Sequence, residues 1–370
     1  MLKSFSVTNF KCFKDKIAFD LGAANGYTFN SDAVYDGIIK AAIVYGHNAS
    51  GKSNLALAMF DIAGHLTDNP NPASRYYPYL NADSEDPVAR FEYVFVFENT
   101  EVIYQYAKTD QTSLVEERLV IDGETVIHSD RTAADKEFLC VLPGTENLKK
   151  NVTQPSLSVI KYIRNNSELP DTPTTRAFAR LFDFVERMLF FKSLDERIYV
   201  GKQPAERDLM DTIISKGLVE DYENFLNEAG IICHLTVIQH GDRKTLARVF
   251  DTGKVVDISD IWSTGTSNLT LFYCWYQQVL AGKVSLLFID EFDAFYHHEL
   301  SRAIINRLKS SPVQFILTTH NTANMTNSLL RPDCYFLIWP HRIDSLSHLT
   351  EKELREAHNI EKMYKAGAFG

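Results

Sequence analysis

The sequence predicts an α/β fold built around a phosphate-binding loop, with an antiparallel β layer and an inserted helical lobe. Three observations lead to this prediction. An apolar run over residues 38–45 is followed by a glycine-rich loop and then by a helical pattern. A second apolar run, residues 286–289, ends in two acidic residues. Between the two runs, alternating and amphipathic stretches must form additional lobes around the central sheet.

Length and composition are those of a large globular protein. The 370 residues exceed the usual size of one domain, and 45% are hydrophobic and 23% charged. A formal net charge of −10 disfavours general coating of nucleic acid unless a local basic patch exists. No run reaches the length of a membrane span and no secretion signal opens the chain, so we expect a cytoplasmic protein without membrane insertion. A reducing compartment also fits five cysteines that are odd in number and form no C-x-x-C pair: Cys12, Cys140, Cys233, Cys274 and Cys334.

The first part of the chain reads mostly as strands. Residues 2–10 and 16–21 alternate and predict an opening hairpin, whereas residues 38–45 are apolar throughout, as a parallel strand buried on both faces requires. Residues 91–97, 102–107 and 114–122 predict consecutive antiparallel strands. The spacing then becomes helical, with one apolar stripe made by Phe178, Leu181, Phe182, Val185 and Met188.

The last third returns to alternating strands and helices. Residues 234–239 and 245–250 predict two strands, and buried strands follow at 285–289, 314–319 and 335–339, with a helix over 300–308. We therefore predict an α/β core from residues 1–67 and 231–370, a β layer from 68–130, and a mainly helical insertion lobe from 131–230.

The glycine-rich loop matches the pattern G-x-x-x-x-G-K-[ST] and lies between a predicted strand and a predicted helix. Backbone N–H groups of such a loop point at phosphates, and the helix that follows adds its positive end. The pattern predicts ATP binding, with Lys52 at the β- and γ-phosphates and in a catalytic role, and Ser53 at Mg²⁺. The predicted nucleotide-binding residues are Gly46, His47, Asn48, Ala49, Ser50, Gly51, Lys52, Ser53 and Asn54.

The second apolar run ends in Asp290 and Glu291. In a nucleotide site Asp290 would hold Mg²⁺ and Glu291 would polarise the attacking water. The alternative is an ordinary strand that ends in a solvated acidic turn. The phosphate loop in the same chain favours the functional interpretation.

The distance along the sequence from Ser53 to Asp290 is much longer than in a compact GTPase and matches the layout of ABC-type and SMC-type ATPase heads. In such heads a signature loop from a partner subunit completes each ATP site. Ser263, Gly265 and Thr266, at the start of a predicted helix, occupy the corresponding place and could grip a γ-phosphate. The alternative is a plain Ser/Thr helix cap.

His320 ends the strand over 314–319, where a switch histidine that senses the γ-phosphate would lie, although a lone histidine at a strand end is more often structural. His297, His298 and Glu299 invite a metal interpretation, but adjacent helical residues point in different directions and no third ligand is evident. We interpret them as surface residues, with His297 as a weak candidate for a contact across a dimer interface. No convincing Q-loop glutamine is found, and Gln105 and Gln111 remain candidates.

These segments together resemble the ABC/SMC-like AAA-type ATPases related to the ATPase part of overcoming-lysogenisation-defect (OLD) proteins. The resemblance covers most of the chain. It rests on residues 5–13, 46–53, 263–266, 290–293, 318–321 and 359–370. It implies a homodimer that closes on ATP and Mg²⁺, with higher oligomers left open, and a role in bacterial anti-phage defence.

Three departures from the family pattern qualify the resemblance. The segment 294–298 lacks the histidine followed by proline that is usual after the second acidic motif. Residues 321–370 are too few for the Toprim nuclease of OLD proteins, so a separate effector chain would have to supply such an activity. Sustained heptads, as in SMC coiled coils, are also missing.

The expected function is an ATP-hydrolysing dimer that senses for, or regulates, a separate effector such as a nuclease or toxin. One alternative is an SMC- or recombination-like DNA-repair ATPase, which would need a basic channel that the net charge does not support. Another is a scaffold or inhibitor that holds ATP with little turnover.

Overall fold

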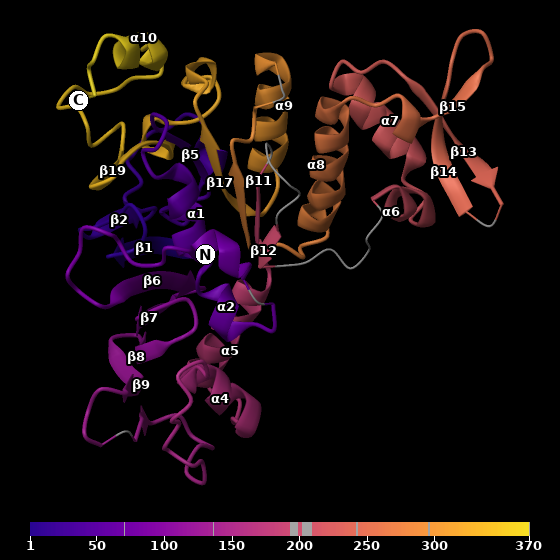
Figure 1. The fold of residues 1–370 in the computed structure, drawn as a ribbon. Helices are drawn as coiled ribbons and strands as arrows, with labels where there is room; N and C mark the ends of the chain where they lie inside the picture. The colour runs from indigo at the N-terminus through magenta and orange to yellow at the C-terminus, as the bar shows by residue number, and fades with distance from the viewer. Residues whose placement is uncertain are drawn as a thin grey trace.

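The computed structural model describes residues 1–69, 71–135, 137–192, 199–201, 209–241, 243–294 and 297–369. The described chain forms a body of two large sheets and an arm that projects from it (Figure 1). The predicted α/β class with an antiparallel β layer is confirmed. None of the helices in these ranges has the length and hydropathy to cross a bilayer.

The first sheet carries the phosphate loop. Its five inner strands run parallel and its two edge strands are antiparallel to their neighbours. All residues of the three central strands are buried, as expected for a sheet covered on both faces. The order is β12 (Tyr199–Gly201), β11 (Met188–Lys192), β16 (Leu286–Asp290), β17 (Gln314–Thr319), β5 (Ala41–Tyr45), β18 (Tyr335–Trp339) and β19 (Arg342–Ser345).

The second sheet is antiparallel and corresponds to the β layer. Strand β6 alternates between buried and more exposed residues, so one face packs inward and the other faces solvent. The opening hairpin belongs to this sheet. The order is β10 (Leu139–Cys140), β9 (Glu124–Asp130), β8 (Leu114–Ile121), β7 (Thr100–Lys108), β6 (Ala89–Phe97), β1 (Leu2–Thr8) and β2 (Ile17–Asp20).

The two sheets are joined by buried polar contacts as well as by apolar packing. The Gln314 side chain accepts a hydrogen bond from Leu2 N (2.9 Å) and donates to Leu2 O (2.8 Å) and Ile39 O (3.1 Å). The helix after the phosphate loop, α1 (Lys52–Phe60), also meets the antiparallel sheet, because the Tyr93 hydroxyl donates to Ala58 O at 3.0 Å. The phosphate loop is therefore anchored to both sheets.

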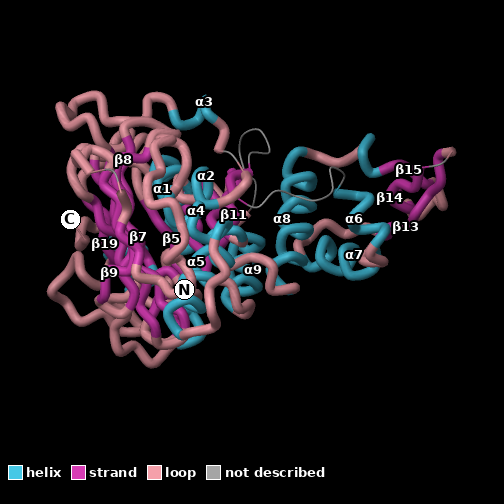
Figure 2. Tube along the Cα trace, turned by 90° about the horizontal axis from the view of Figure 1, so that it is seen from below, coloured by secondary structure: helices cyan, strands magenta, loops and turns pink. Residues whose placement is uncertain are grey.

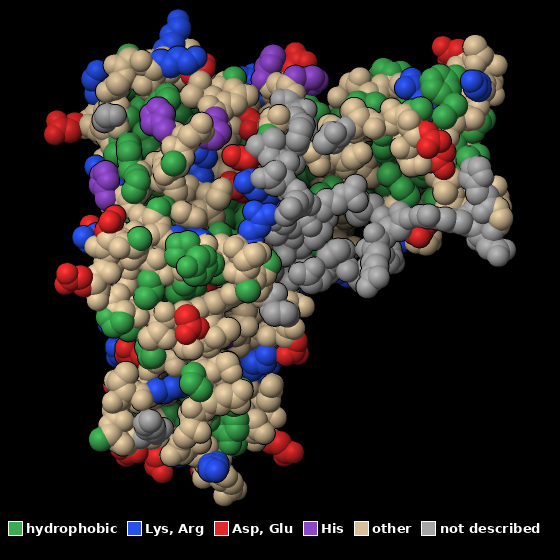
Figure 3. Space-filling model, viewed as in Figure 1, with side chains coloured by type: hydrophobic (Ala, Val, Ile, Leu, Met, Phe, Trp, Pro, Cys, Tyr) green, Lys and Arg blue, Asp and Glu red, His purple; other side chains and the backbone are tan. Residues whose placement is uncertain are grey.

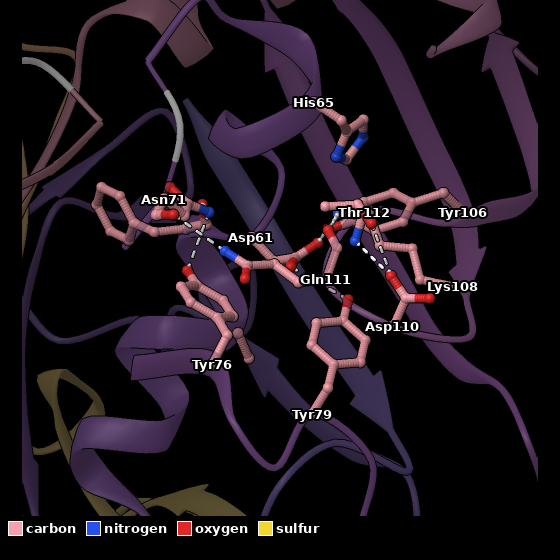
Figure 4. Close-up of polar contacts among 12 residues, drawn as sticks. Asp61, His65, Asn71, Tyr76, Tyr79, Tyr106, Lys108, Asp110, Gln111 and Thr112 are labelled. Atoms are coloured by element: carbon pink, nitrogen blue, oxygen red, sulfur yellow. Dashed lines mark hydrogen bonds and ion pairs between the residues drawn. The ribbon is translucent and has the colours of Figure 1, made fainter. Parts of the chain in front are cut away.

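A buried ion pair lies just beyond the end of α1 (Figure 4). Lys108 Nζ is 2.6 Å from Asp61 Oδ2, and both side chains are almost fully buried. The Tyr106 hydroxyl donates to the same oxygen at 2.9 Å, and Tyr79 donates to Asp61 Oδ1 at 3.1 Å. His65, in α2 (Ala63–Leu66), lies against the Tyr106 ring. Asp61 thus ties the phosphate-loop helix to strand β7.

Smaller elements complete the body. Helices α4 (Val159–Asn166) and α5 (Pro173–Glu186) pack against α2, and α5 also contacts the antiparallel sheet. The remaining elements are α3 (Ala73–Tyr76), the hairpin β3 (Val34–Tyr35) with β4 (Ile38–Ile39), α9 (His298–Lys309) and α10 (Ile360–Lys365). Helix α10 contacts the loop after β17, since Thr322 Oγ1 donates to Glu361 Oε1 at 2.9 Å.

The described residues of the arm form the α-helices α6, α7 and α8 and a small antiparallel sheet, and the arm extends away from the two large sheets (Figure 2). Aromatic side chains form its interior, among them Tyr222 and Tyr273 with ring centroids 4.8 Å apart. Arg307 of α9 links the arm to the body through an ion pair with Glu228 and through the Phe225 ring. The arm elements are α6 (Leu209–Ser215), α7 (Val219–Glu228), β13 (His234–His240), β14 (Arg243–Val249), β15 (Val255–Asp257) and α8 (Thr264–Leu280).

The three segments that the sequence divides into core, β layer and helical lobe do not correspond to three separate parts of the structure. Residues 131–230, expected as one helical lobe, contribute β10, α4 and α5 to the body, β11 and β12 to the parallel sheet, and α6 and α7 to the arm. Of the expected core segment, β1 and β2 belong to the antiparallel sheet and β13 to β15 to the arm. Residues 38–45 form two short strands, and Met188 starts β11 rather than extending helix α5. A short run buried on both faces cannot be told from a buried helical segment by periodicity.

Candidate functional site

The phosphate loop joins the end of β5 to the start of α1, and two of its glycines cannot be replaced without a clash. A Cβ on Gly46 would lie 2.3 Å from Ser50 Oγ and 2.9 Å from Ile338 O. Gly51 has φ of +107°, and a Cβ there would be 2.7 Å from the Phe13 ring. The sequence therefore uses glycine where the backbone must turn and pass close to its neighbours.

The cation of the loop is Lys52, the first residue of α1. Its ammonium group donates to Gly46 O at 2.7 Å and to His47 O at 3.0 Å, across the mouth of the loop. Burial lowers the pKa of Lys52, while the nearby carboxylates of Asp290 and Glu291 raise it. The Ser50 hydroxyl, also buried, has no hydrogen-bond partner among the described residues. A buried hydroxyl beside a lysine and a helix N-terminus fits a phosphate group.

Asp290 ends β16 and meets the phosphate loop directly. Ser53 Oγ donates to Asp290 Oδ2 at 2.5 Å, and Thr318 Oγ1 of the next strand donates to Asp290 Oδ1 at 2.5 Å. The Asp290 side chain is fully buried. The two residues predicted to hold Mg²⁺ therefore lie side by side, and a hydroxyl with a carboxylate is a donor set that suits this ion.

Glu291 follows at the carboxyl edge of the sheet in a strained backbone conformation, with φ of +51°. Its N–H donates to Thr318 Oγ1 at 2.9 Å, which fixes the turn after the strand. Its carboxylate lies between two nitrogen groups. Oε1 is 4.0 Å from His320 Nε2, and Oε2 is 3.9 Å from Lys192 Nζ.

His320 follows the last residue of β17 and completes the row at this edge. Burial and the neighbouring Lys52 lower its pKa, whereas Glu291, Asp290 and Asp293 raise it, with a net decrease from 6.5. Burial raises the pKa of Asp293, which accepts hydrogen bonds from Thr319 Oγ1 at 2.6 Å and Asn324 Nδ2 at 3.3 Å. The net decrease in the pKa of His320 favours the neutral imidazole over the charged one.

The other predicted residues of the loop lie around its rim. His47, Asn48 and Ala49 are exposed, and Ala49 adopts a positive φ of 62°. Burial raises the pKa of the Cys12 thiol, in the turn after β1, and a hydrogen bond with Asn54 partly offsets this increase. Acidic and basic side chains adjoin one another on the molecular surface between the body and the arm (Figure 3).

Ser263, Gly265 and Thr266 lie on the arm and not in this cluster. Ser263 caps α8, because its Oγ accepts a hydrogen bond from Thr266 N at 3.3 Å, and Gly265 and Thr266 belong to the first turn. Ser263 thus forms the plain helix cap that was the alternative interpretation of this segment. A cap does not prevent the same helix end from meeting a ligand on another molecule.

The sequence did not single out Lys192. It ends β11 and pairs in register with Asp290, so it belongs to the same sheet edge as the two acids. The signal available was an apolar run, residues 188–191, ending in a cation, but this run was interpreted as helical. The glutamine candidates lie elsewhere: Gln105 donates to Glu92 at 2.6 Å on the antiparallel sheet, and Gln111 donates to Asn71 O.

One of the two histidines at the start of α9 has a structural role. His297 is the N-cap of α9, with its Nδ1 accepting a hydrogen bond from Leu300 N at 3.1 Å, and His298 and Glu299 are exposed. Residues 295 and 296, within the segment that departs from the family pattern, lie outside the described residues. In the described ranges, no three His, Cys, Asp or Glu side chains are grouped as a metal site.

Comparisons with known proteins give a family and several distant structures. The family model described as "AAA domain, putative AbiEii toxin, Type IV TA system" matches residues 41–325. No curated protein matches the chain. The SMC head domain from Thermotoga maritima is 14% identical with a TM-score of 0.47, and the match covers 93% of this chain and 98% of that one.

Two further solved structures are similar at the same level. The Smc head domain with an extended coiled coil from Pyrococcus furiosus, bound to the C-terminal domain of ScpA, is 11% identical with a TM-score of 0.48, covering 93% of this chain and 96% of that one. The recombination mediator protein RecF with ATP is 14% identical with a TM-score of 0.39, covering 94% and 99%.

Proposed function

Because the chain belongs to the family of AAA domains that matches residues 41–325, we propose that it binds ATP with Mg²⁺ and hydrolyses it to ADP and phosphate. One observation carries this proposal. The Ser53 hydroxyl and the Asp290 carboxylate, far apart in the sequence, meet at 2.5 Å beside Lys52 and Glu291. A strand ending in an acid next to a phosphate loop is the arrangement with which P-loop NTPases hold the nucleotide and Mg²⁺.

Each residue of the cluster has a task in this proposal. Lys52 and the N–H groups of the loop hold the phosphates, and Ser53 and Asp290 hold Mg²⁺. The ion, when bound, neutralises charge on the phosphate oxygens. Glu291 orients the attacking water and accepts its proton, and the neutral imidazole of His320 responds to loss of the terminal phosphate. The partners of Asp290 keep its carboxylate fixed throughout.

The proposed active form is a homodimer. The first turn of α8, with Ser263, Gly265 and Thr266, lies on the arm and presents N–H and hydroxyl groups at a helix N-terminus. In a closed dimer this turn would cap the terminal phosphate held by Lys52 of the second copy. ATP would thus close the pair, and hydrolysis would open it.

In the cell, we place this ATPase as a switch that regulates a separate effector, with anti-phage defence as the setting. The description of the matching family names a putative AbiEii toxin of a type IV TA system, which supports a role in controlling toxicity. Co-purification with the products of neighbouring genes tests this role. Recovery of the chain alone, under conditions that preserve known toxin complexes, would count against a stable effector.

The enzymatic proposal is tested by phosphate release from purified variants. Lys52→Ala should lose nucleotide binding, and Glu291→Gln should bind ATP but release little phosphate and remain dimeric. Glu299→Gln, at an exposed acid of α9, is the matched control and should behave as the wild type. Stable ATP occupancy without turnover in the wild type would instead indicate a scaffold. Salt-sensitive duplex binding that stimulates turnover would indicate a DNA-repair ATPase.

A further inference from the structure

Strand β11 brings a cation to the edge of the sheet where the two acids lie. It pairs in parallel with β16 from Met188 to Lys192, and the last pair in the register is Lys192 with Asp290. Parallel strands end at the same edge of a sheet, so the side chain of Lys192 is held beside the residues that follow β16. The side chains of Lys192 and Glu291 are both largely buried, each with 22% of its surface exposed.

The backbone of Glu291 is fixed independently of its carboxylate. The hydrogen bond from its N–H to Thr318 and its left-handed conformation hold the main chain. The carboxylate itself lies close to two nitrogen groups, at 3.9 Å from Lys192 Nζ and 4.0 Å from His320 Nε2. Of these two neighbours, Lys192 is the ammonium group, and it faces the carboxylate from strand β11.

We propose that Lys192 is a positioning residue for Glu291. The ammonium group holds one carboxylate oxygen at the sheet edge, so that the other remains turned toward the phosphate loop and His320. The inference rests on the proposed function, because it assigns Lys192 a task only if Glu291 orients the attacking water. Lys192 acts through Glu291 and not on the nucleotide.

The position of Lys192 also distinguishes it from the other cation of the site. Lys52 bonds the carbonyl groups of the phosphate loop, where it meets phosphate. Lys192 comes from a strand on the opposite side of β16 from β17, and its ammonium group forms an ion pair with Glu291. Loss of Lys52 should therefore abolish binding, whereas loss of Lys192 should leave binding intact and impair turnover.

The experiment compares Lys192→Met with Lys192→Arg in the full chain. Lys192→Met should lower kcat about 10- to 100-fold, the range seen when the partner that orients a reacting group is lost. The KM and the Kd for ATP should stay within about twofold of the wild type. Lys192→Arg keeps the charge and should restore most of kcat. Lys283→Met, at an exposed lysine in the connection between α8 and β16, is the matched control.

The outcomes separate this inference from the function on which it rests. If the wild type turns over, Glu291→Gln is inactive and Lys192→Met equals the wild type, the positioning role is wrong and the proposed function stands. If neither the wild type nor any variant releases phosphate, the proposed function fails. A loss of ATP affinity in a folded Lys192→Met protein, shown by an unchanged thermal midpoint, would overturn the inference by making Lys192 a nucleotide ligand. If Lys192→Met does not fold, Lys192→Arg is compared with Lys192→Gln instead. A Lys192→Arg protein that binds ATP with full affinity but has the same kcat as Lys192→Gln would overturn the inference.

Discussion

At the scale of single residues, Thr318 organises both acids of the site. Its hydroxyl donates to Asp290 Oδ1 at 2.5 Å and accepts from Glu291 N at 2.9 Å. One side chain on β17 thus fixes the carboxylate that would hold Mg²⁺ and the backbone turn that aims the next carboxylate. Thr318 belongs to one of the segments that carry the family resemblance, but its contact with both acids could not be predicted from the sequence, because it depends on the pairing of β17 with β16.

Thr318→Val removes both hydrogen bonds while nearly keeping the shape of the side chain. We expect it to reduce the free energy of unfolding by about 1–3 kcal/mol, the cost of leaving a buried carboxylate short of a partner. Phosphate release should fall more steeply than ATP affinity. Urea unfolding and a turnover assay measure the two effects. Thr125→Val, at a hydroxyl bonded to the exposed Arg118, serves as the control, and equal effects in both variants would contradict the role of Thr318.

His65 makes the stability of the body depend on pH. Burial, and secondarily the neighbouring Lys108, lower its pKa well below 6.5 in the folded chain. At pH values between the folded and the unfolded pKa of His65, the imidazole binds a proton only in the unfolded chain. The free energy of unfolding therefore decreases as the pH falls below about 6.5, by up to about 1.4 kcal/mol per pH unit. Above that pH the effect is absent.

The measurement is chemical unfolding at a series of pH values for the wild type and for His65→Gln, which retains a group that can bond Tyr104. The difference between the two curves should be constant above pH 6.5 and change below it, with the wild type losing more stability. Parallel curves down to pH 5 would show that His65 is not buried in its neutral form.

At the scale of elements, the phosphate-loop helix depends on the sheet below it. The Asp61–Lys108 pair and the tyrosines around it join the end of α1 to β7, and these side chains are almost fully buried (Figure 4). Breaking such a pair from one side leaves a buried charge unpaired, which costs far more than losing an exposed pair. The position of α1 is thus set by contacts remote from the nucleotide loop.

Lys108→Met should lower the free energy of unfolding by about 3–5 kcal/mol. Lys3→Met is the matched control on the same sheet, because the Lys3–Glu101 pair is exposed, with about two-fifths of each side chain accessible. It should cost no more than about 1 kcal/mol. Both values come from urea titration. A Lys108→Met protein as stable as the control would mean that Asp61 is satisfied by its tyrosine partners alone.

Some parts of the site could be predicted from the sequence, and others depend on how the elements pair. The phosphate loop, Asp290 and Glu291 are local patterns, and the structure brings them together at the edge where β5 and β16 end. Lys192 could not be found in that way, because β11 is only five residues long and its first residue, Met188, continues the apolar stripe of the helix before it. Its place beside β16 depends on a pairing across residues 193–285. The division into a body and an arm depends on the same kind of long-range pairing.

At the scale of the whole molecule, the arm carries one half of the proposed site and the body the other. Arg307 holds the two parts together through Glu228 and the ring of Phe225. Within one chain, the first turn of α8 does not belong to the cluster around Lys52. The proposed dimer therefore predicts that each ATP is served by two different copies.

Mixing two inactive variants tests this arrangement. Lys52→Ala disables the phosphate loop, and Ser263→Arg blocks the first turn of α8, so each alone should release little phosphate. In an equal mixture that exchanges subunits, half of the dimers contain one intact site, and turnover should return to about a quarter of the wild-type rate. Activity of Ser263→Arg alone, or a mixture that stays inactive despite exchange shown by labelled subunits, would contradict a shared site.

The strand that carries the phosphate loop has both of its sheet neighbours, β17 and β18, in the last part of the chain. During synthesis on the ribosome, residues 41–53 emerge long before residues 314–339 exist to pair with them. The nascent chain thus holds its nucleotide loop unassembled until residues 314–339 have been translated. A prematurely terminated product that lacks these late strands would be unable to bind nucleotide and would expose β5 to chaperones and proteases.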